Sequence, residues 1–232
     1  MMELLKCINV NKSFGEKQIL KDVNITIPRG KIVGLLGKNG MGKSTIIKLI
    51  NDLLTIDSGE ILINGEKIGV ESKKIISYLP ERTYLDKSMT VDEVIIYFKD
   101  FYDNFDDVKA RKLLEDLDLD VNQKLSKMSK GMQEKVQLVL VMSRKAELYI
   151  LDEPLGGVDP ATRDYILDTI LTNFNENASI IISTHLISDV ERVLDEVIFI
   201  DKGEIILSSD CDTLRKKEKG SIDEIFRGMF KC

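Results

Sequence analysis

The sequence contains few cysteines, no long hydrophobic run and no excess of basic residues. Cys7, Cys211 and Cys232 are the only cysteines among 232 residues, and none lies close to another in the sequence. This spacing argues against a disulfide framework and favours reduced thiols in a cytoplasmic protein. The longest apolar stretches, such as 136–142 and 178–182, are far too short to span a bilayer.

The charge balance argues against a nucleic-acid-binding protein. The chain carries 33 lysines and arginines against 39 aspartates and glutamates, a net charge of -6. Because nucleic-acid binding needs a basic surface, we expect no nucleic-acid partner. Residues 1–13 also lack the basic start and long apolar centre of a signal peptide. With 43% hydrophobic and 31% charged residues, the composition is that of a soluble globular protein.

The most informative stretch is the glycine-rich segment 31–45, KIVGLLGKNGMGKST. It begins with an apolar run typical of a buried strand, and apolar residues at helical spacing follow it. Between them lies the phosphate-binding pattern of two glycines with four residues between them, followed by lysine and serine. The alternative is a glycine-rich turn with an incidental lysine, but the flanking strand and helix favour a nucleoside-triphosphate site.

Each residue type in this loop has a chemical reason to be there. Glycines let backbone N–H groups approach phosphate oxygens, and the following helix adds its positive N-terminal end. Lys43 supplies a cation for the β- and γ-phosphates, and the Ser44 hydroxyl is a suitable ligand for Mg²⁺. The residues expected to bind ATP are Gly37, Lys38, Asn39, Gly40, Met41, Gly42, Lys43, Ser44 and Thr45.

Two later apolar strands end in polar side chains. Residues 148–151 lead into Asp152 and Glu153, and residues 180–183 lead towards His185, the only histidine. In a parallel α/β sheet, ligands gather at the carboxyl ends of the strands. We therefore expect Asp152 to act on the Mg²⁺ held by Ser44, and Glu153 to polarise the attacking water. A neutral His185 is expected to hydrogen-bond the γ-phosphate.

The remaining sequence predicts an α/β protein with one helical insertion. Strand patterns dominate residues 2–29, 58–63 and 75–79, with Phe14 in a loop after the first strand. From about 90 to 142 the periodicity is helical, after which strands and helices alternate again. An amphipathic stretch near the C-terminus predicts a peripheral helix packed on the core.

The order of these motifs resembles the nucleotide-binding domain of ATP-binding cassette (ABC) proteins over essentially the whole chain. The family signature, usually Leu-Ser-Gly-Gly-Gln, falls on residues 128–132, MSKGM. The resemblance implies that Ser129 and Gly131 contact ATP bound to a second subunit, a head-to-tail homodimer or pair of paralogues. It also leads us to expect Ser129 and Lys43 on opposite faces of one subunit.

Three further positions match the family. Phe14 falls where an aromatic ring stacks on adenine, although a buried core phenylalanine is an open alternative. Asp159 falls in the loop that links the two subunits' sites. Glu81 stands where the family usually has a glutamine near Mg²⁺ or the attacking water, and a carboxylate there keeps a metal-capable oxygen.

The resemblance implies a P-loop NTPase (RecA-like) core with an N-terminal antiparallel β subdomain and an inserted α-helical subdomain. We expect one domain, with residues 1–82 and 145–210 as the core, 83–144 as the helical subdomain and 211–232 as a helical tail. ATP and Mg²⁺ are the implied cofactors, and Lys43, Glu153 and His185 the catalytic residues.

The implied function is an ATPase that drives separately encoded transmembrane permease subunits from the inner face of the cell membrane. Small bacterial drug and peptide exporters are most similar, and an importer is an open alternative. A soluble single-cassette ATPase in an assembly complex is another hypothesis. A P-loop kinase is a third, and the signature loop argues against it.

Overall fold

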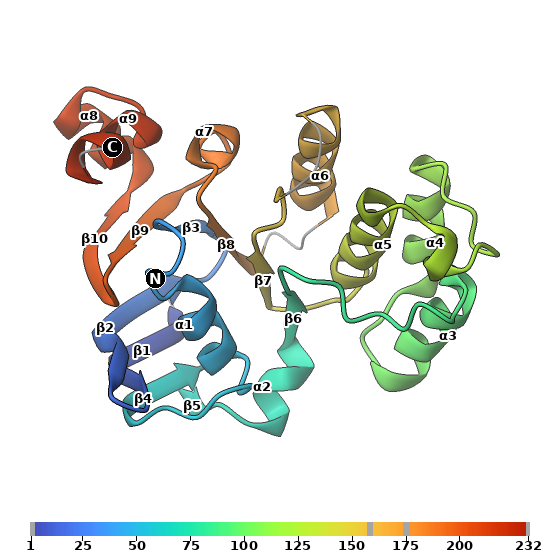
Figure 1. Ribbon diagram of the computed structural model, residues 1–232, viewed down its shortest axis with the longest axis horizontal. Helices are drawn as coiled ribbons and strands as arrows, with labels where there is room; N and C mark the ends of the chain where they lie inside the picture. The colour runs from blue at the N-terminus through green and yellow to red at the C-terminus, as the bar shows by residue number, and fades with distance from the viewer. Residues whose placement is uncertain (1–2, 157–159, 174–176, 231–232) are drawn as a thin grey trace.

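The computed structural model describes residues 3–156, 160–173 and 177–230, and two β-sheets lie at its centre (Figure 1). An antiparallel sheet has the order β2-β1-β4-β5, with β1 at Glu3–Phe14, β2 at Lys17–Pro28, β4 at Ser58–Ile63 and β5 at Glu66–Lys67. A larger sheet has the order β10-β9-β3-β8-β7-β6. Its strands are β3 (Ile32–Leu36), β6 (Ile76–Leu79), β7 (Leu148–Asp152), β8 (Ser179–Thr184), β9 (Glu196–Asp201) and β10 (Glu204–Asp210).

Helices flank the larger sheet and extend to one end of the molecule (Figure 1). The helices are α1 (Lys43–Ile50), α2 (Val70–Ile75), α3 (Val91–Phe101), α4 (Asp107–Asp116), the 3₁₀ helix η1 (Leu125–Lys127), α5 (Lys130–Met142), α6 (Pro160–Asn173), α7 (Ile187–Val190), α8 (Cys211–Glu218) and α9 (Ile222–Phe230).

The register of the central strands determines where the site lies. Strands β3, β8 and β7 are parallel neighbours, and every residue in them is buried, as the continuous apolar runs predict. Asp152 pairs with Ser183, and Leu36 pairs with Thr184. The carboxyl ends of the three strands therefore lie side by side, and the segments after them meet at one edge of the sheet.

The helices α3, α4 and α5 enclose an apolar cluster of their own, which includes Val94, Leu114 and Val139. The start of α3 follows from its sequence, because Thr90 and Glu93 cap it reciprocally through side chain and backbone. Lys109 of α4 ties this helical layer to the core. Its ammonium group donates to the carbonyl oxygens of Met142, at 2.7 Å, and Asn173, at 2.6 Å.

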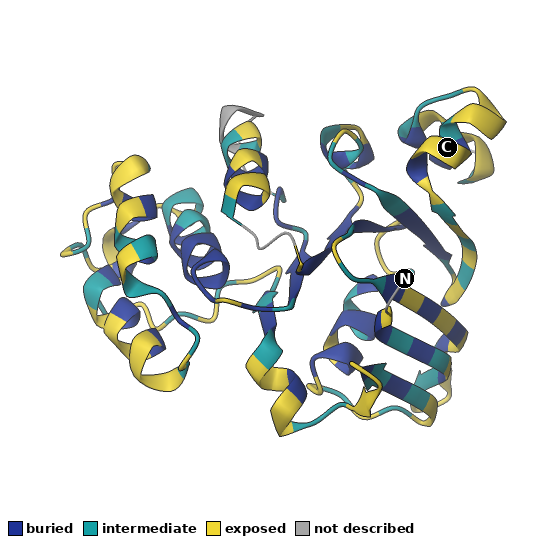
Figure 2. Cartoon of the chain, turned by 180° about the vertical axis from the view of Figure 1, so that it is seen from behind, coloured by how far each residue is buried: buried dark blue, intermediate teal, exposed yellow. Residues whose placement is uncertain are grey.

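The C-terminal helix packs on the core, which confirms the prediction of a peripheral helix. Phe226 and Phe230 of α9 lie against Phe199 of β9, with ring centroids 5.2 and 6.4 Å from it. Figure 2 shows the same arrangement as buried strands surrounded by helices with exposed outer faces. Among the described residues, no helix is long and apolar enough to cross a membrane. Of the cysteines, Cys7 and Cys211 are buried and free.

Two details of the predicted strands were wrong. Phe14 is not in a loop but is the last residue of β1, and it pairs with Lys17 across a tight hairpin. This strand is longer than its alternating pattern because β2 pairs with it as far as Phe14. Ile75 ends α2 instead of beginning the next strand.

Candidate active site

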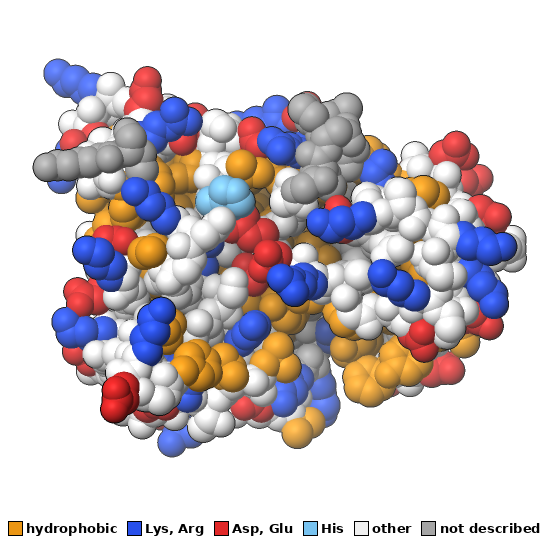
Figure 3. Space-filling view, in the orientation of Figure 1, with side chains coloured by type: hydrophobic (Ala, Val, Ile, Leu, Met, Phe, Trp, Pro, Cys, Tyr) orange, Lys and Arg blue, Asp and Glu red, His pale blue; other side chains and the backbone are white. Residues whose placement is uncertain are grey.

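A cleft of about 1220 Å³ runs from the phosphate loop to the start of α5. Its walls include the expected residues Phe14, Asn39, Gly40, Gly42, Lys43, Ser44, Thr45, Glu81, Glu153 and His185. Figure 3 shows the single histidine, in pale blue, at the surface with acidic side chains beside it. A hollow of this size accommodates a nucleotide.

The phosphate loop depends on glycine at specific positions. Gly40 and Gly42 have φ angles of 80° and 110°, a region that other residues rarely adopt, and Gly42 caps the start of α1. At Gly37 a Cβ atom would lie 2.5 Å from the carbonyl oxygen of Ile200. The loop therefore has its shape because β9 packs closely behind it.

Two side chains of the loop point towards the C-terminal part of the chain. Lys38 donates to the carbonyl oxygen of Phe230 at 3.4 Å. The Met41 sulfur lies 3.3 Å from the backbone nitrogen of Lys202, and the Met41 carbonyl accepts from Gly203 at 3.1 Å. These two residues and Gly37 support the loop from outside the cleft, whereas the other six residues of 37–45 line it.

The side chain of Lys43 folds back into the phosphate loop that precedes it. Its side chain is 5% exposed, and its ammonium donates to the carbonyl oxygens of Gly37 at 2.7 Å and Lys38 at 3.3 Å. The same nitrogen lies 3.5 Å from Oε1 of Glu153. A buried cation is thus held at the loop by neutral carbonyls and one carboxylate.

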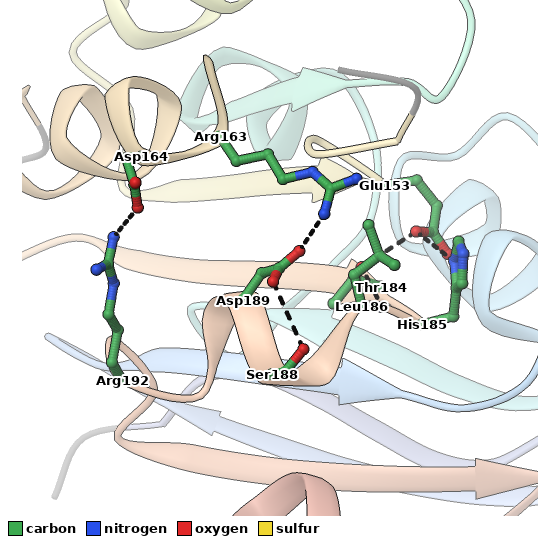
Figure 4. Close-up of polar contacts among 9 residues, drawn as sticks. All are labelled: Glu153, Arg163, Asp164, Thr184, His185, Leu186, Ser188, Asp189 and Arg192. Carbon is green, nitrogen blue, oxygen red and sulfur yellow. Dashed lines mark hydrogen bonds and ion pairs between the residues drawn. The ribbon is translucent and has the colours of Figure 1, made fainter. Parts of the chain in front are cut away.

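Glu153 lies where the carboxyl ends of β7 and β8 meet. Its backbone is left-handed, with φ at 51°, and its N–H donates to the carbonyl oxygen of Ser183 at 2.8 Å. Its Oε2 accepts from the Thr184 hydroxyl at 3.2 Å and lies 2.9 Å from Nδ1 of His185 (Figure 4). The carboxylate is therefore fixed between a lysine and a histidine and is only 10% exposed.

Asp152 is the last residue of β7, directly before Glu153, and is 2% exposed. Burial raises the pKa of its carboxyl group, the Ser183 and Ser44 hydroxyls oppose this shift, and the Glu153 and Glu81 carboxylates add to it. Its Oδ1 atom is buried and has no hydrogen-bond partner among the described residues.

The oxygens around Asp152 fit a Mg²⁺ ion that completes its shell with phosphate and water. Mg²⁺ commonly binds through one or two carboxylates together with substrate phosphates. No group of three or more His, Cys, Asp or Glu side chains within the described ranges is arranged to hold a metal ion alone. Glu81 is exposed, lines the cleft and lies close enough to Asp152 to act on its carboxyl group.

Two ion pairs of opposite direction join α6 to α7 and to the turn that follows α7 (Figure 4). Arg163 pairs with Asp189 at 2.7 Å, and Arg192 pairs with Asp164 at 2.7 Å. Since α7 follows His185 directly, this double link fixes the segment after His185 to α6. Asp159, expected just before α6, lies outside the described residues.

Phe14 is 50% exposed and lines the cleft. The alternative of a core phenylalanine is therefore wrong, because a core side chain would be shielded from solvent. The ammonium of Lys12 lies 5.4 Å from the centre of its ring. An exposed ring at one end of the cleft is available for stacking on a base.

Ser129 is the N-cap of α5, where its hydroxyl accepts from the Met132 N–H at 3.2 Å. Its neighbours Met128 and Lys130 line the same cleft as Lys43. The expectation that Ser129 and Lys43 lie on opposite faces is therefore wrong. Among the described residues, none from outside this helix start would lie within 4 Å of a Cβ atom at Gly131, so this face of the helix start has space for a ligand.

The chain was compared with known proteins. The ABC transporter family model matches residues 20–156. YtrB of Bacillus subtilis, an ABC transporter ATP-binding protein, is 30% identical over 92% of this chain and 74% of its own. SrtF of Streptococcus pyogenes, a lantibiotic transport ATP-binding protein, is 32% identical over 90% and 92%. This chain belongs to the ABC transporter family. It is therefore a nucleotide-binding ATPase.

The fold agrees with this assignment. The solved structure of an ATP-binding subunit of an ABC transporter has a TM-score of 0.88 and 28% identity, covering 98% of this chain and 99% of that one. A nucleotide-free cassette of an ABC transporter, 23% identical with a TM-score of 0.78, supports the fold alone. The P-loop NTPase fold predicted from the sequence is confirmed.

The structure adds residues to this ABC site that the sequence analysis missed. Arg82, Lys87 and Lys130 bring three basic side chains to the cleft, and Gln133 and Glu134 of α5 also line it. Lys130 lies in the signature and Gln133 directly follows it, so the sequence could have indicated both residues. Arg82 and Lys87 have no comparable pattern, because only the path of the chain after β6 brings them there.

Proposed function

We propose that this ABC ATPase is the ATP-binding subunit of an exporter for a drug, peptide or similar compound. It works with separately encoded permease subunits at the cytoplasmic face of a membrane. The names of its relatives support export. SrtF is a lantibiotic transport protein, LnrL of Bacillus subtilis is a linearmycin resistance protein, and a Rhizobium relative is a Nod factor export protein.

The observation that carries the catalytic proposal is the position of Glu153 between Lys43 and His185. Its two carboxylate oxygens face a cation at 3.5 Å and an imidazole nitrogen at 2.9 Å. A carboxylate held at the mouth of a phosphate loop is well placed to accept a proton from the attacking water. We assign Glu153 as the general base and Lys43 as the group that neutralises phosphate charge.

ATP binding changes the partners of Lys43. Its ammonium donates to two neutral carbonyl oxygens, and anionic phosphate oxygens are stronger acceptors at the same place. When Lys43 turns to the phosphates, Glu153 loses its cation and keeps its contacts with Thr184 and His185. The Thr184 and His185 contacts then hold the carboxylate in place while the substrate is bound.

The contact between His185 and Glu153 also restricts what the imidazole does. A neutral ring that donates its Nδ1 proton to Glu153 has no proton on Nε2. Phosphate oxygens are acceptors, so a contact between His185 and the γ-phosphate requires a proton on the donating nitrogen. A contact with the γ-phosphate therefore requires His185 to donate to the phosphate, and we assign His185 as the residue that senses it.

Mg²⁺ would be held by Ser44 and Asp152, with Glu81 facing the same space, and would neutralise charge on the phosphates. The chain's own part is to present oxygens of the right kind. The buried Oδ1 of Asp152 supports this assignment, because an unpaired buried acceptor is costly unless a ligand satisfies it.

We further propose that two subunits close head to tail around ATP. Ser129 and Gly131 stand at the N-terminal end of α5, where backbone N–H groups favour an anion. The residues beside them border the cleft, so this helix end is accessible. Phosphates bound to the partner's loop reach it when the two subunits meet. Phe14 stacks on the adenine, and Asp159 links the two sites.

An exposed aromatic patch, formed by Tyr84, Tyr97 and Phe101, suits contact with the permease. These side chains are 55%, 56% and 64% exposed, and Tyr97 stacks on Phe101. Tyr84 follows Glu81 by three positions in the sequence. Large exposed apolar groups on a helical layer mark protein contacts, and movement of this layer would reach Glu81.

Purification from native membranes tests the transporter proposal. We expect the protein to be recovered with a permease that has several apolar spans. Tyr97→Asp and Phe101→Ser should lose this partner, whereas ATP hydrolysis by the isolated protein remains. Val108→Ser on α4, which removes another exposed apolar side chain, is the control. Recovery from the soluble fraction with an assembly complex would contradict the proposal.

A further inference from the structure

A lysine lies over the ring of Phe14, the residue proposed to stack on adenine. Lys12 and Phe14 are two positions apart in β1, and the Lys12 ammonium is 5.4 Å from the centre of the ring. Among the described residues that line the cleft, Phe14 is present and Lys12 is not. The ammonium therefore covers the ring from outside the cleft, and the cleft side of the ring stays open to a base.

One carboxylate holds both residues that precede Phe14. Oδ1 of Asp57 accepts from the Lys12 ammonium at 2.8 Å, and Oδ2 accepts from the backbone N–H of Ser13 at 2.6 Å. These hydrogen bonds lower the pKa of Asp57, so its carboxylate is charged at neutral pH. The Lys12 side chain is only 14% exposed, which limits the positions that its ammonium can take.

The path of the chain brings Asp57 to this place from the phosphate loop. Helix α1 begins at the loop, and Asp57 lies between the end of this helix and β4. Ser58, the first residue of β4, pairs with Asn11 of β1, and the Asp57 N–H donates to the Asn11 carbonyl oxygen at 3.0 Å. The segment after the phosphate-binding helix therefore reaches the strand end that carries Phe14.

We propose that Lys12 and Asp57 are positioning residues for the base of ATP. Their ion pair fixes the ammonium over the outer face of Phe14, where the attraction between a cation and an electron-rich ring orients the ring. A side chain that is already oriented loses less conformational freedom when adenine stacks on its other face. The proposal rests on the stacking role assigned to Phe14 above and extends it.

Replacement of Asp57 by asparagine tests the pair. An amide has one acceptor oxygen, so if this oxygen keeps the Ser13 N–H, the amide NH₂ group faces Lys12 and two donors cannot pair. The Kd for ATP should rise about two- to fivefold, the effect of one exposed cation–π contact. Removal of a negative charge by itself favours an anionic ligand. The expected change is therefore opposite in sign to a general electrostatic effect.

A double-mutant cycle tests whether the two residues act through the ring. Lys12→Met should raise the Kd for ATP as Asp57→Asn does, and the combined variant should raise it no further. In a Phe14→Ala background neither change should alter the Kd, because no ring remains to be oriented. Effects that multiply, or that persist without the ring, would refute the proposal. Calorimetric titration with ATP measures each value.

Two controls separate positioning from charge and from stability. Lys6 also lies in β1 and pairs with Glu3 at 3.0 Å, so Lys6→Met removes the same charge elsewhere in the strand and should leave the Kd unchanged. The melting temperature of nucleotide-free Asp57→Asn should stay close to that of the wild type, because exposed ion pairs contribute little stability. A rise in Kd in Lys6→Met equal to that in Lys12→Met would overturn the proposal.

Inorganic tripolyphosphate, which has the phosphates of ATP but no base, gives the sharpest test. Its Kd should be the same in the wild type, Lys12→Met and Asp57→Asn. Equal weakening for tripolyphosphate and ATP would place the effect at the phosphates and overturn the proposal. If Phe14→Ala binds ATP as well as the wild type, stacking itself fails, and the positioning role with it. If Phe14→Ala weakens binding but Asp57→Asn does not, the positioning role alone fails.

Discussion

Nδ1 of His185 lies 2.9 Å from Oε2 of Glu153, although the two residues are 32 positions apart in the sequence. The pairing of Asp152 with Ser183 in neighbouring parallel strands places the following residues side by side. This contact orients the carboxylate while its other oxygen faces Lys43. The proposed base is thus positioned by the sheet before any nucleotide is bound.

Replacement of Glu153 by glutamine tests its role as general base. The amide keeps the shape of the side chain but cannot accept the water proton, so kcat should fall by about 10²–10⁴. ATP binding should remain, and the ATP-bound dimer should accumulate in sizing experiments. Glu66→Gln, on the exposed edge strand β5, is the matched control. Wild-type turnover in Glu153→Gln would remove this residue from the mechanism.

Replacement of Phe14 by alanine tests adenine stacking. Because the ring is half exposed, its loss should leave the melting temperature of the nucleotide-free protein unchanged. Affinity for ATP should weaken by about 1–3 kcal/mol, by analogy with base stacking in nucleic-acid complexes. Calorimetric titration with ATP measures this change. Equal affinities in Phe14→Ala and the exposed control Val108→Ala would rule out stacking.

A mixture of two inactive variants tests whether Ser129 acts on its neighbour's nucleotide. Ser129→Asp keeps an oxygen that caps α5 but places a negative charge against the partner's phosphates. It should bind ATP as a monomer and fail to hydrolyse it. Lys43→Ala should lose ATP affinity, because the buried cation that neutralises the phosphates is removed.

In a mixed dimer of these variants, one composite site carries both changes and the other carries neither. Mixing the two proteins should therefore restore part of the ATPase activity, measured as phosphate release. Each variant mixed with itself is the control and should stay inactive. Normal hydrolysis by Ser129→Asp alone would exclude a role for this residue in a partner's site.

The pKa of Asp152 predicts a pH-dependent stability. Since burial raises this pKa, the native protein binds a proton there more readily than the unfolded chain does. The contribution to stability is therefore present at low pH and is lost as the pH rises through the native pKa. Asp152→Asn should melt at a higher temperature than the wild type at neutral pH when Mg²⁺ is absent.

This advantage should shrink as the pH is lowered towards the range in which carboxyl groups ordinarily titrate. Mg²⁺ with ATP should then stabilise the wild type more than Asp152→Asn. Thermal melts across pH, with Asp100→Asn as an exposed control, measure both effects. A pH-independent difference between the two proteins would show that the carboxyl group does not titrate as argued.

The sequence by itself determined the elements that local chemistry specifies. Glycines at positions with positive φ, a lysine and serine after them, and apolar runs on either side are sufficient to predict the loop after β3. The same holds for the strands that end at Asp152 and Thr184, because a fully buried strand reads as a continuous apolar run. The signature at 128–132 was located by its resemblance to the family.

Only the tertiary structure decided how these elements meet. Strand register places Glu153 against His185, and it cannot be read from either strand alone. The exposure of Phe14 depends on what packs around the hairpin, so the sequence left two interpretations open. Gln137 interrupts the apolar stretch 136–142, yet its contact with the carbonyl oxygen of Pro80 exists only because α5 packs beside the end of β6. Local patterns encode backbone conformation, whereas partners distant in the sequence are determined by long-range packing.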